Sequence, residues 1–367
     1  MFPPPCPELL LLKMQFSLIL VYAALLLGLA IPVTSSAVPE APLVVEKRAH
    51  TSHKKPVKYT GSEKELAQFV ALAQESYCEN GYVGMKVGDS ELVYSYGTGD
   101  LLQRVNVWKS ENEGIVVAIQ GTDPLHNWSI NWDLLHKKVK ADPAFRKSVP
   151  KDVRLFHGFQ EAWIKVSNRI IPVVKAVLKK YDESRVSVTG HSLGAAMSLI
   201  AAAHLHKELG DKAMHRIVVF GLPRTGNPAF ATWIDETFGD RFHWVVNGGD
   251  PVPHMVPRRL GYQHPGNQIW INPPNSEHYK LYPGQENIHG MDSAILDFNV
   301  LDHQGIYFHT LLWTIFGPCP AKPDDMQRKN LPKQDHAVIQ RQIKKMQAVN
   351  KKMGKTFFVK GNLTQQH

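Results

Sequence analysis

One short stretch of this chain has the residue types and spacing of a nucleophilic serine. Residues 190–194 read Gly-His-Ser-Leu-Gly; a β-branched run precedes them and a run of small residues follows. This pattern predicts a sharp strand–turn–helix connection with Ser192 at its apex. Gly190 and Gly194 carry no side chain, so strand and helix can pass close together. The helix N-terminus would then stabilise negative charge developing beside the serine.

A glycine-rich turn without any chemistry has the same pattern, so the serine needs partners elsewhere in the chain. A serine hydroxyl becomes a good nucleophile only when a histidine takes its proton and an acid orients that histidine. In hydrolases with this turn, the acid and then the histidine follow the serine along the chain. Asp250 comes directly after a predicted strand, where ligands gather in open α/β sheets, and is the candidate acid. A turn-forming Asp before proline is the alternative interpretation.

Six histidines lie between Asp250 and Cys319, and their spacing alone does not choose the base. They are His254, His264, His278, His289, His303 and His309. His254 is too close in sequence to Asp250 to arrive from another loop. His303 lies late in the chain, shortly before Cys319, where a disulfide-clamped loop would hold a base rigidly. A structural role is the alternative for each of the others.

Two backbone amides are candidates for binding the oxyanion of an ester or amide intermediate. The Leu193 amide follows the serine directly. Thr122 ends the strongest early strand and would contribute its amide and also its hydroxyl.

Residues 123–135 are too apolar for an ordinary exposed loop. This stretch starts at Asp123 and includes Pro124, Leu125, Trp128 and Trp132. It predicts an amphipathic lid that covers an apolar site in water and opens at a lipid surface. The alternative is a helix packed permanently on the core. Glycosylation sequons occur at Asn127, inside this lid, and at Asn362; a glycan at Asn127 would hinder closure, so Asn362 is the better candidate.

The surrounding elements alternate between strands and helices, which predicts an α/β fold with a mostly parallel sheet covered on both faces. Predicted strands cover 92–96, 105–108, 115–120, 153–156, 185–189, 216–220 and 241–246. Predicted helices cover 62–77, 158–180, 193–209 and 227–238, the first with a capping pattern of Ser62 and Glu65. We expect loops over 121–150, and loops with short strands over 251–300.

The N-terminal region has the layout of a secreted precursor. Residues 1–37 read as a signal peptide, with an apolar run after Lys13 and small residues at its end; Met14 is an alternative start. An uncleaved membrane anchor is the other interpretation. Residues 38–48 are Pro-rich and end in a dibasic pair, which predicts removal of a propeptide, although such a pair in a linker can also be without function. We expect an extracellular, monomeric protein.

The charge of the chain is concentrated at its C-terminus. The net charge is +9, and residues 321–367 hold eleven basic and three acidic side chains, so the body, 49–320, is close to neutral. Nucleic-acid binding by the body is therefore not expected. The tail is either a helix that lies on a membrane surface or a partly disordered solvated segment.

Three cysteines are present, and their spacing shows no zinc pattern. Cys6 lies in the presegment. Cys78 and Cys319 bracket the body and would pair in an oxidising compartment; two unpaired buried thiols are the alternative. We expect neither a metal nor an organic cofactor.

Taken together, these motifs resemble the fungal lipase family called class 3. The matching blocks are Gln-Gly-Thr at 120–122, His-Gly-Phe at 157–159, Gly-His-Ser-Leu-Gly at 190–194, the run 220–228, Asp-Pro-Val-Pro-His at 250–254 and Asp-His at 302–303. The blocks 261–265, 280–287 and 302–309 are similar to secreted lipases of Malassezia-type yeasts, some of which prefer mono- and diacylglycerols. The resemblance implies an α/β-hydrolase fold with a helical lid.

The resemblance also implies roles for individual residues. It implies Ser192 as nucleophile, Asp250 as acid and His303 as base, with Thr122 and Leu193 as oxyanion donors. It further implies that Cys78 pairs with Cys319. The spacing after His303 follows the narrower group, with three residues before a Tyr-Phe pair where many members have two. The predicted lid and the basic tail lie outside the matching blocks, so the resemblance leaves substrate preference open.

The sequence therefore predicts a secreted serine lipase that hydrolyses acylglycerol esters at a membrane or emulsion interface through an acyl-enzyme. One alternative is an esterase for non-lipid esters, such as feruloyl esters. Another is a non-catalytic lipid-binding surface protein. The preference among mono-, di- and triacylglycerols stays open.

Overall fold

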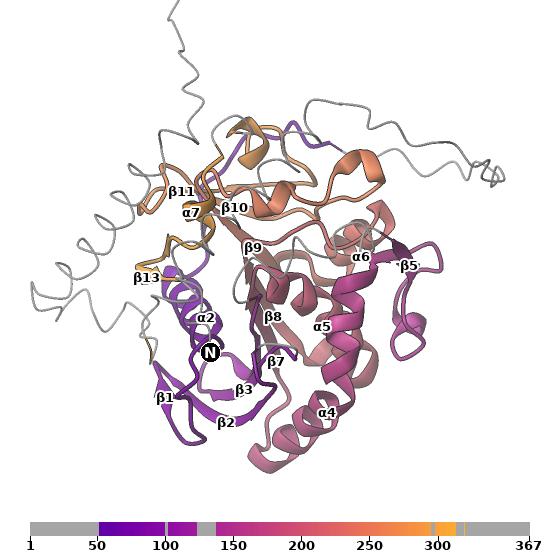
Figure 1. The fold of residues 1–367 in the computed structure, drawn as a ribbon, viewed down its shortest axis with the longest axis vertical. Helices are drawn as coiled ribbons and strands as arrows, with labels where there is room; N and C mark the ends of the chain where they lie inside the picture. The colour runs from indigo at the N-terminus through magenta and orange to yellow at the C-terminus, as the bar shows by residue number, and fades with distance from the viewer. Residues whose placement is uncertain (1–50, 100–101, 123–136, 295–297, 313–318, 320–367) are drawn as a thin grey trace, which may run out of the picture.

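The computed structural model describes residues 51–99, 102–122, 137–294 and 298–312, together with Cys319. The predicted signal peptide, propeptide, lid and basic tail lie outside these residues, as do Asn127 and Asn362. The described residues form a central sheet with helices on both of its faces (Figure 1). None of the helices among them is both long enough and apolar enough to cross a membrane.

Nine strands of the described chain form the central sheet, in the order β1-β2-β3-β4-β7-β8-β9-β10-β11. Their bounds are β1 Lys86–Val87, β2 Ser90–Tyr96, β3 Val105–Ser110, β4 Gly114–Ile119, β7 Val186–His191, β8 Met214–Phe220, β9 Phe242–Asn247, β10 Gln268–Ile271 and β11 Tyr279–Tyr282. Strands β4, β7, β8, β9 and β10 run parallel, as the alternating pattern predicts. Antiparallel pairing joins β1 to β4 in series and adds β11 at the other edge. The carboxyl ends of the five parallel strands therefore meet at one edge.

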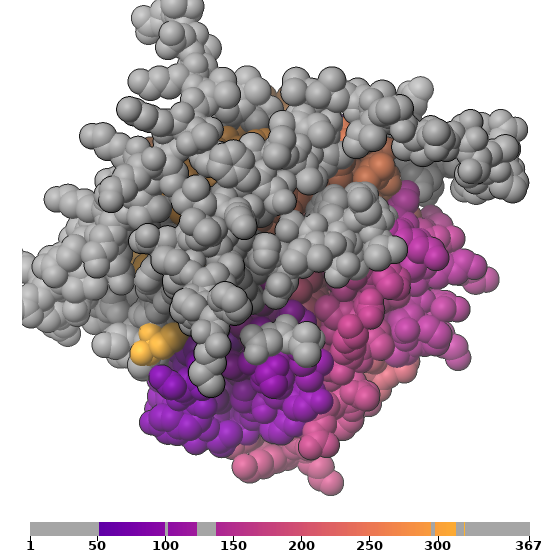
Figure 2. All heavy atoms as spheres, in the orientation of Figure 1, coloured from indigo at the N-terminus to yellow at the C-terminus, as the bar shows by residue number. Residues whose placement is uncertain are grey.

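Helices cover the two faces of the sheet unequally. They are α2 (Glu63–Glu75), α4 (His157–Tyr181), α5 (Leu193–Leu209) and α6 (Pro228–Phe238). In β4, Val117 packs into the cluster that contains α4, α5 and α6, whereas Val116 packs into the cluster that contains α2. This alternation is the period of two expected of a strand buried on both faces. In the space-filling view of Figure 2, the purple surface of the first strands borders the magenta surface of the region that contains α4.

The predicted N-terminus of α2 is confirmed. The Ser62 hydroxyl accepts the Glu65 amide hydrogen at 3.2 Å, so a side chain satisfies one of the free amides of the first turn. At its other end, α2 leads directly into Tyr77 and Cys78, both buried. This turn brings the N-terminal part of the chain to the edge where the parallel strands end.

Two regions differ from the sequence-based expectation. The stretch expected as a loop over 121–150 contains β5 (Lys138–Lys140), which pairs with β6 (Arg154–Phe156). By contrast, the short strands expected within 251–300 are present as β10 and β11, which extend the main sheet; β10 is buried along its whole length, so no alternation marks its bounds in the sequence. His303 ends a short helix, α7 (Val300–His303), and does not lie in an open loop.

Candidate active site

Ser192 connects β7 to α5 in a strained conformation. Its φ is 60° and its ψ −126°, a combination that non-glycine residues rarely adopt. A Cβ on Gly190 would lie 2.7 Å from the Ser198 hydroxyl oxygen, and one on Gly194 would lie 2.8 Å from the Gln120 carbonyl oxygen. Both positions therefore require glycine, and the serine is held at the apex of the turn as the sequence pattern predicts.

Asp250 and His303 meet beside this turn. Asp250 follows β9, and its Oδ2 lies 2.8 Å from Nδ1 of His303, with both side chains fully buried. The other carboxylate oxygen accepts the Val252 amide hydrogen at 2.8 Å. An ionised carboxylate only accepts, so Nδ1 of His303 carries the proton and Nε2 presents its lone pair. This is the tautomer that a general base requires.

The end of β4 lies against the serine. A Cβ on Gly121 would be 3.0 Å from the Cβ of Ser192 and 2.6 Å from the His191 carbonyl oxygen. Thr122 is the next residue and is 7 % exposed. Leu193 is the first residue of α5, so its amide has no acceptor within the helix. The two expected oxyanion donors thus lie on the two segments that flank Ser192.

Three buried polar atoms at this edge have no hydrogen-bond partner within the described part of the chain. They are Oγ of Ser192, Nε2 of His303 and Oγ1 of Thr122. A hydrogen bond between Ser192 and His303 is not formed in this structure; such bonds often tighten only when substrate binds. Buried polar atoms are normally paired, so these three atoms are the ones available to bond to a reacting molecule.

Comparison with known proteins gives a consistent result. The family model described as lipase (class 3) matches residues 116–260. A secreted mono- and diacylglycerol lipase of Malassezia globosa is 44 % identical over 280 residues, which cover 76 % of this chain and 92 % of the relative. A relative of the same description from Malassezia restricta is 42 % identical over 294 residues, covering 77 % and 95 %. The chain belongs to the class 3 lipase family.

The solved structures agree with this assignment. Lipase II from Rhizopus niveus superimposes with a TM-score of 0.61 at 27 % identity, covering 71 % of this lipase and 99 % of that chain. The predicted α/β-hydrolase fold is confirmed. The lipase is accordingly a carboxylic ester hydrolase of the serine type.

A second buried carboxylate, that of Asp302, connects the loop that contains Asp250 to α7, the helix that ends at His303. Asp302 Oδ2 accepts the Gly249 amide hydrogen at 2.8 Å, and Oδ1 accepts a hydrogen from the Asn299 side chain at 2.8 Å. Burial, followed by the negative charge of Asp250, raises the pKa of Asp302 to about 7. Asp302 therefore fixes the residue before Asp250 relative to the helix that ends at His303.

Two of the other candidate histidines have structural partners. His264 stacks on Trp244 with ring centroids 4.2 Å apart, and its Nε2 bonds to the Pro253 carbonyl. His254 lies 3.5 Å from an Asp292 carboxylate oxygen. Burial lowers the pKa of both histidines to about 3, so both stay neutral at neutral pH. Neither contacts Asp250 in the manner of His303.

The loop after Asp250 is held by a buried ion pair that sequence reasoning did not identify. Arg224 donates to both oxygens of Glu286, at 2.7 and 2.8 Å, and to the carbonyl oxygens of Pro253 and Val256. Burial opposes ionisation of Glu286, but the charge of Arg224 outweighs it and lowers the pKa to about 2. Arg224 lies in the 220–228 block of the motif comparison, which was the only signal in the sequence.

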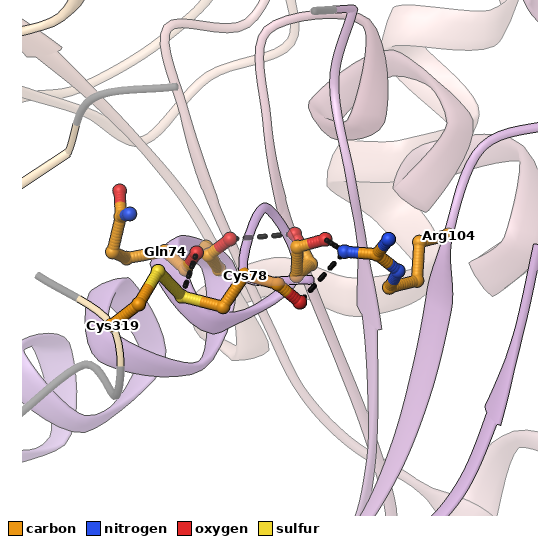
Figure 3. The surroundings of a disulfide bond; sticks show 6 residues. Gln74, Cys78, Arg104 and Cys319 are labelled. Atoms are coloured by element: carbon orange, nitrogen blue, oxygen red, sulfur yellow. Dashed lines mark hydrogen bonds between the residues drawn. A yellow bond between two sulfur atoms is a disulfide. The ribbon is translucent and has the colours of Figure 1, made fainter. Parts of the chain in front are cut away.

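The lipase contains the expected disulfide between Cys78 and Cys319, which are 241 positions apart (Figure 3). Next to it, the Arg104 guanidinium donates to the Cys78 carbonyl oxygen at 2.7 Å. No group of three or more His, Cys, Asp or Glu side chains in the described ranges is arranged to hold a metal ion.

Proposed function

We propose that this lipase hydrolyses the ester bonds of acylglycerols outside the cell, with Ser192 as nucleophile, His303 as base and Asp250 as the acid that orients it. The observation that carries these roles is the buried His303–Asp250 pair at 2.8 Å beside a strained serine whose hydroxyl oxygen is free to react. The names of the Malassezia relatives support both secretion and the acylglycerol substrate.

In the first half-reaction, Oγ of Ser192 attacks the ester carbonyl carbon while Nε2 of His303 takes the hydroxyl proton. The carbonyl oxygen becomes an oxyanion, which the amides of Leu193 and Thr122 stabilise together with the N-terminus of α5. The carboxylate of Asp250 stabilises the imidazolium that forms. Collapse of the tetrahedral intermediate breaks the ester C–O bond, and His303 returns the proton to the departing glycerol oxygen.

In the second half-reaction, His303 removes a proton from water, and the hydroxide attacks the acyl-enzyme. The same two amides stabilise the second oxyanion. When the intermediate collapses, Ser192 leaves with a proton from His303 and a fatty acid is released. Every proton that is moved passes through Nε2 of His303, while Nδ1 keeps its bond to Asp250 throughout.

The finer features of the substrate are part of the same proposal. We expect mono- and diacylglycerols to be cleaved faster than triacylglycerols, because both Malassezia relatives bear that description. We further propose that the enzyme works as a monomer at a lipid–water interface. The predicted lid, residues 123–135, which is too apolar for an exposed loop, supports the interfacial part of this proposal.

The proposal is tested by the rate of fatty acid release from mono-, di- and triacylglycerols of one acyl chain length. The rate of ferulic acid release from methyl ferulate, as a fourth substrate, is compared with these rates. We expect hydrolysis of mono- and diacylglycerol that is lost by about 10⁴-fold or more in Ser192→Ala. Ser167→Ala is the matched control, because this buried serine lies on α4 and bonds only to the Ile164 carbonyl among the described contacts. Absence of acylglycerol hydrolysis, or faster cleavage of the ferulate ester, would contradict the proposal.

A further inference from the structure

A continuous chain of hydrogen bonds connects the three segments that carry the proposed catalytic groups. The Gly121 amide donates to the Tyr77 phenol oxygen at 3.1 Å. The same phenol lies 2.8 Å from Nδ1 of His191. Nε2 of His191 lies 2.9 Å from the carbonyl oxygen of His303. These hydrogen bonds thus link three parts of the site: the oxyanion segment, which we define as Gly121–Thr122; His191, the residue before the nucleophile; and the backbone of His303.

The hydrogens in this series of hydrogen bonds can be placed in only one way. The His303 carbonyl oxygen can only accept, so Nε2 of His191 carries a hydrogen. Burial, and then the charge of nearby His303, hold the pKa of His191 well below its usual range, so the ring is neutral and Nδ1 is bare. The Tyr77 hydroxyl therefore donates to Nδ1 and accepts from Gly121. Each donor in the chain has one acceptor, and no member is left unpaired.

His191 also supports the base through its ring. The imidazoles of His191 and His303 are stacked, with centroids 4.4 Å apart and planes 29° apart. A second positive charge at this distance would oppose the protonation of His303 during catalysis. Among the described residues, the side chains that bond to the His191 ring or lie against it are Tyr77, His303 and Tyr307, and none of the three is a carboxylate. This environment keeps the ring neutral while His303 gains and loses its proton.

Tyr77 is itself held from several directions. Its amide donates to the Gln74 carbonyl at 3.0 Å, which extends the last turn of α2. The next residue, Cys78, forms the disulfide with Cys319 and accepts a hydrogen bond from Arg104 (Figure 3). The Arg104 amide in turn donates to the side-chain oxygen of Gln120, the residue before Gly121, and the Gln120 amide donates to the Arg104 carbonyl oxygen. The phenol therefore has a fixed position relative to the oxyanion segment.

We propose that Tyr77 and His191 are positioning residues that hold Gly121–Thr122 and His303 in register with Ser192. The inference rests on the proposed roles of Ser192, His303 and Thr122. Neither residue touches the reacting atoms; Tyr77 acts through Gly121 and His191, and His191 acts through the backbone and the ring of His303. We call the bonds from Gly121 to His303 the Tyr77–His191 relay.

Removal of single atoms from the relay tests the proposal. Tyr77→Phe keeps the ring but deletes the acceptor of Gly121 and the donor to His191. We expect kcat on a soluble ester to fall by about 10- to 100-fold with KM little changed, because the relay places groups and does not bind substrate. Tyr279→Phe is the matched control; it removes a phenol that bonds to Glu63 at 2.7 Å and should leave kcat unchanged.

A double variant separates a relay from two unrelated structural contacts. His191→Gln removes the acceptor of the Tyr77 hydrogen. If the two residues act as one unit, Tyr77→Phe combined with His191→Gln loses no more activity than the more damaged single variant. Losses that multiply, or a Tyr77→Phe enzyme with kcat within about twofold of the parent, would overturn the proposal.

The tautomer of His191 can be measured on the unmodified enzyme, so this test does not depend on the folding of any variant. Nitrogen-15 spectra of the intact enzyme should show His191 as the neutral Nε2–H tautomer, without titration from about pH 5 to pH 9. An Nδ1–H tautomer, or titration near the usual histidine pKa, would refute the relay.

Phosphonate labelling distinguishes failure of the proposed function from failure of the relay. An unlabelled wild type contradicts the proposed function, whereas wild type and Tyr77→Phe labelled at equal rates contradict the relay alone.

Discussion

A substitution at Gly221 would perturb the base and its acid without replacing any catalytic side chain. It follows β8 with a φ of +57°. A Cβ on this residue would lie 2.7 Å from Cε1 of His303, 2.8 Å from Nδ1 of the same ring and 3.1 Å from Oδ2 of Asp250. Gly221→Ala therefore inserts one methyl group directly against the His303–Asp250 pair.

The expected loss of activity in Gly221→Ala can be worked out from these distances. Carbon atoms pack at about 3.5 Å or more, so the His303 ring must move by roughly 1 Å. A displacement of this size at reacting groups costs about 100-fold in rate, or about 2.7 kcal/mol in the activation barrier. The positive φ adds a separate cost to the fold of about 1–2 kcal/mol, because an alanine Cβ is strained in that conformation.

Gly239→Ala is the control that separates the two effects. Gly239 also has a positive φ, +49°, but a Cβ there would meet nothing within 4 Å. We expect both variants to lose stability in urea unfolding by about 1–2 kcal/mol. Only Gly221→Ala should lose kcat, measured on a soluble ester at a temperature where both variants are folded.

The reasoning would be refuted if Gly221→Ala kept the kcat of the parent. It would also be refuted if Gly239→Ala lost activity to the same extent, because backbone strain alone would then account for the effect.

Three further predictions concern the scaffold. Arg224→Met removes both hydrogen bonds of the closest cation to the buried Glu286, which among the described residues keeps only the His264 amide and the more distant Arg258 guanidinium at 3.9 Å, and should destabilise the fold by about 3 kcal/mol in urea unfolding. The double variant Arg224→Met, Glu286→Leu should recover part of this loss; a double variant as unstable as Arg224→Met would contradict this account. Burial, followed by the charge of Glu65, raises the pKa of Glu113 from 4.5 to about 7, so the contribution of this one group to stability is complete below pH 4.5 and is lost as pH rises toward 7. Compared with the parent, Glu113→Gln should remove up to about 3 kcal/mol of this pH-dependent loss, and an unchanged pH slope would contradict the prediction. Cys78→Ser with Cys319→Ser should cost about 2–5 kcal/mol in thermal or urea unfolding, and a variant as stable as the parent would show that the disulfide does not constrain the fold.

Much of the fold follows from local patterns in the sequence. The helix 193–209 was predicted with its observed bounds, because glycines and a serine stop the strand before it and Gly210 follows its end. The parallel sheet follows from the alternation of strands and helices. Short strands are expected within 251–300, but the bounds of β10 cannot be predicted, because all four of its residues are buried and no period of two is visible.

The candidate site was predictable to the extent that its chemistry fixes the order of the residues along the chain. The order Ser, Asp, His and the place of Asp250 directly after a predicted strand select the acid. The choice of His303 depends largely on the family resemblance, since six histidines lie between Asp250 and Cys319. Contacts between distant positions could not be predicted. The relay joins Tyr77 to His191 across 114 positions and His191 to His303 across 112. Nothing in the local pattern of either residue indicates its partner.

The central claim is that Ser192 is the nucleophile. Its most direct test is to treat the lipase with an alkyl phosphonate and to locate the adduct by mass spectrometry of the digested protein. The account predicts one phosphonyl group on the peptide that contains Ser192, with loss of hydrolysis in step with labelling and no adduct on Ser192→Ala. An adduct on a different residue that abolishes activity, or full activity with Ser192 modified, would contradict it.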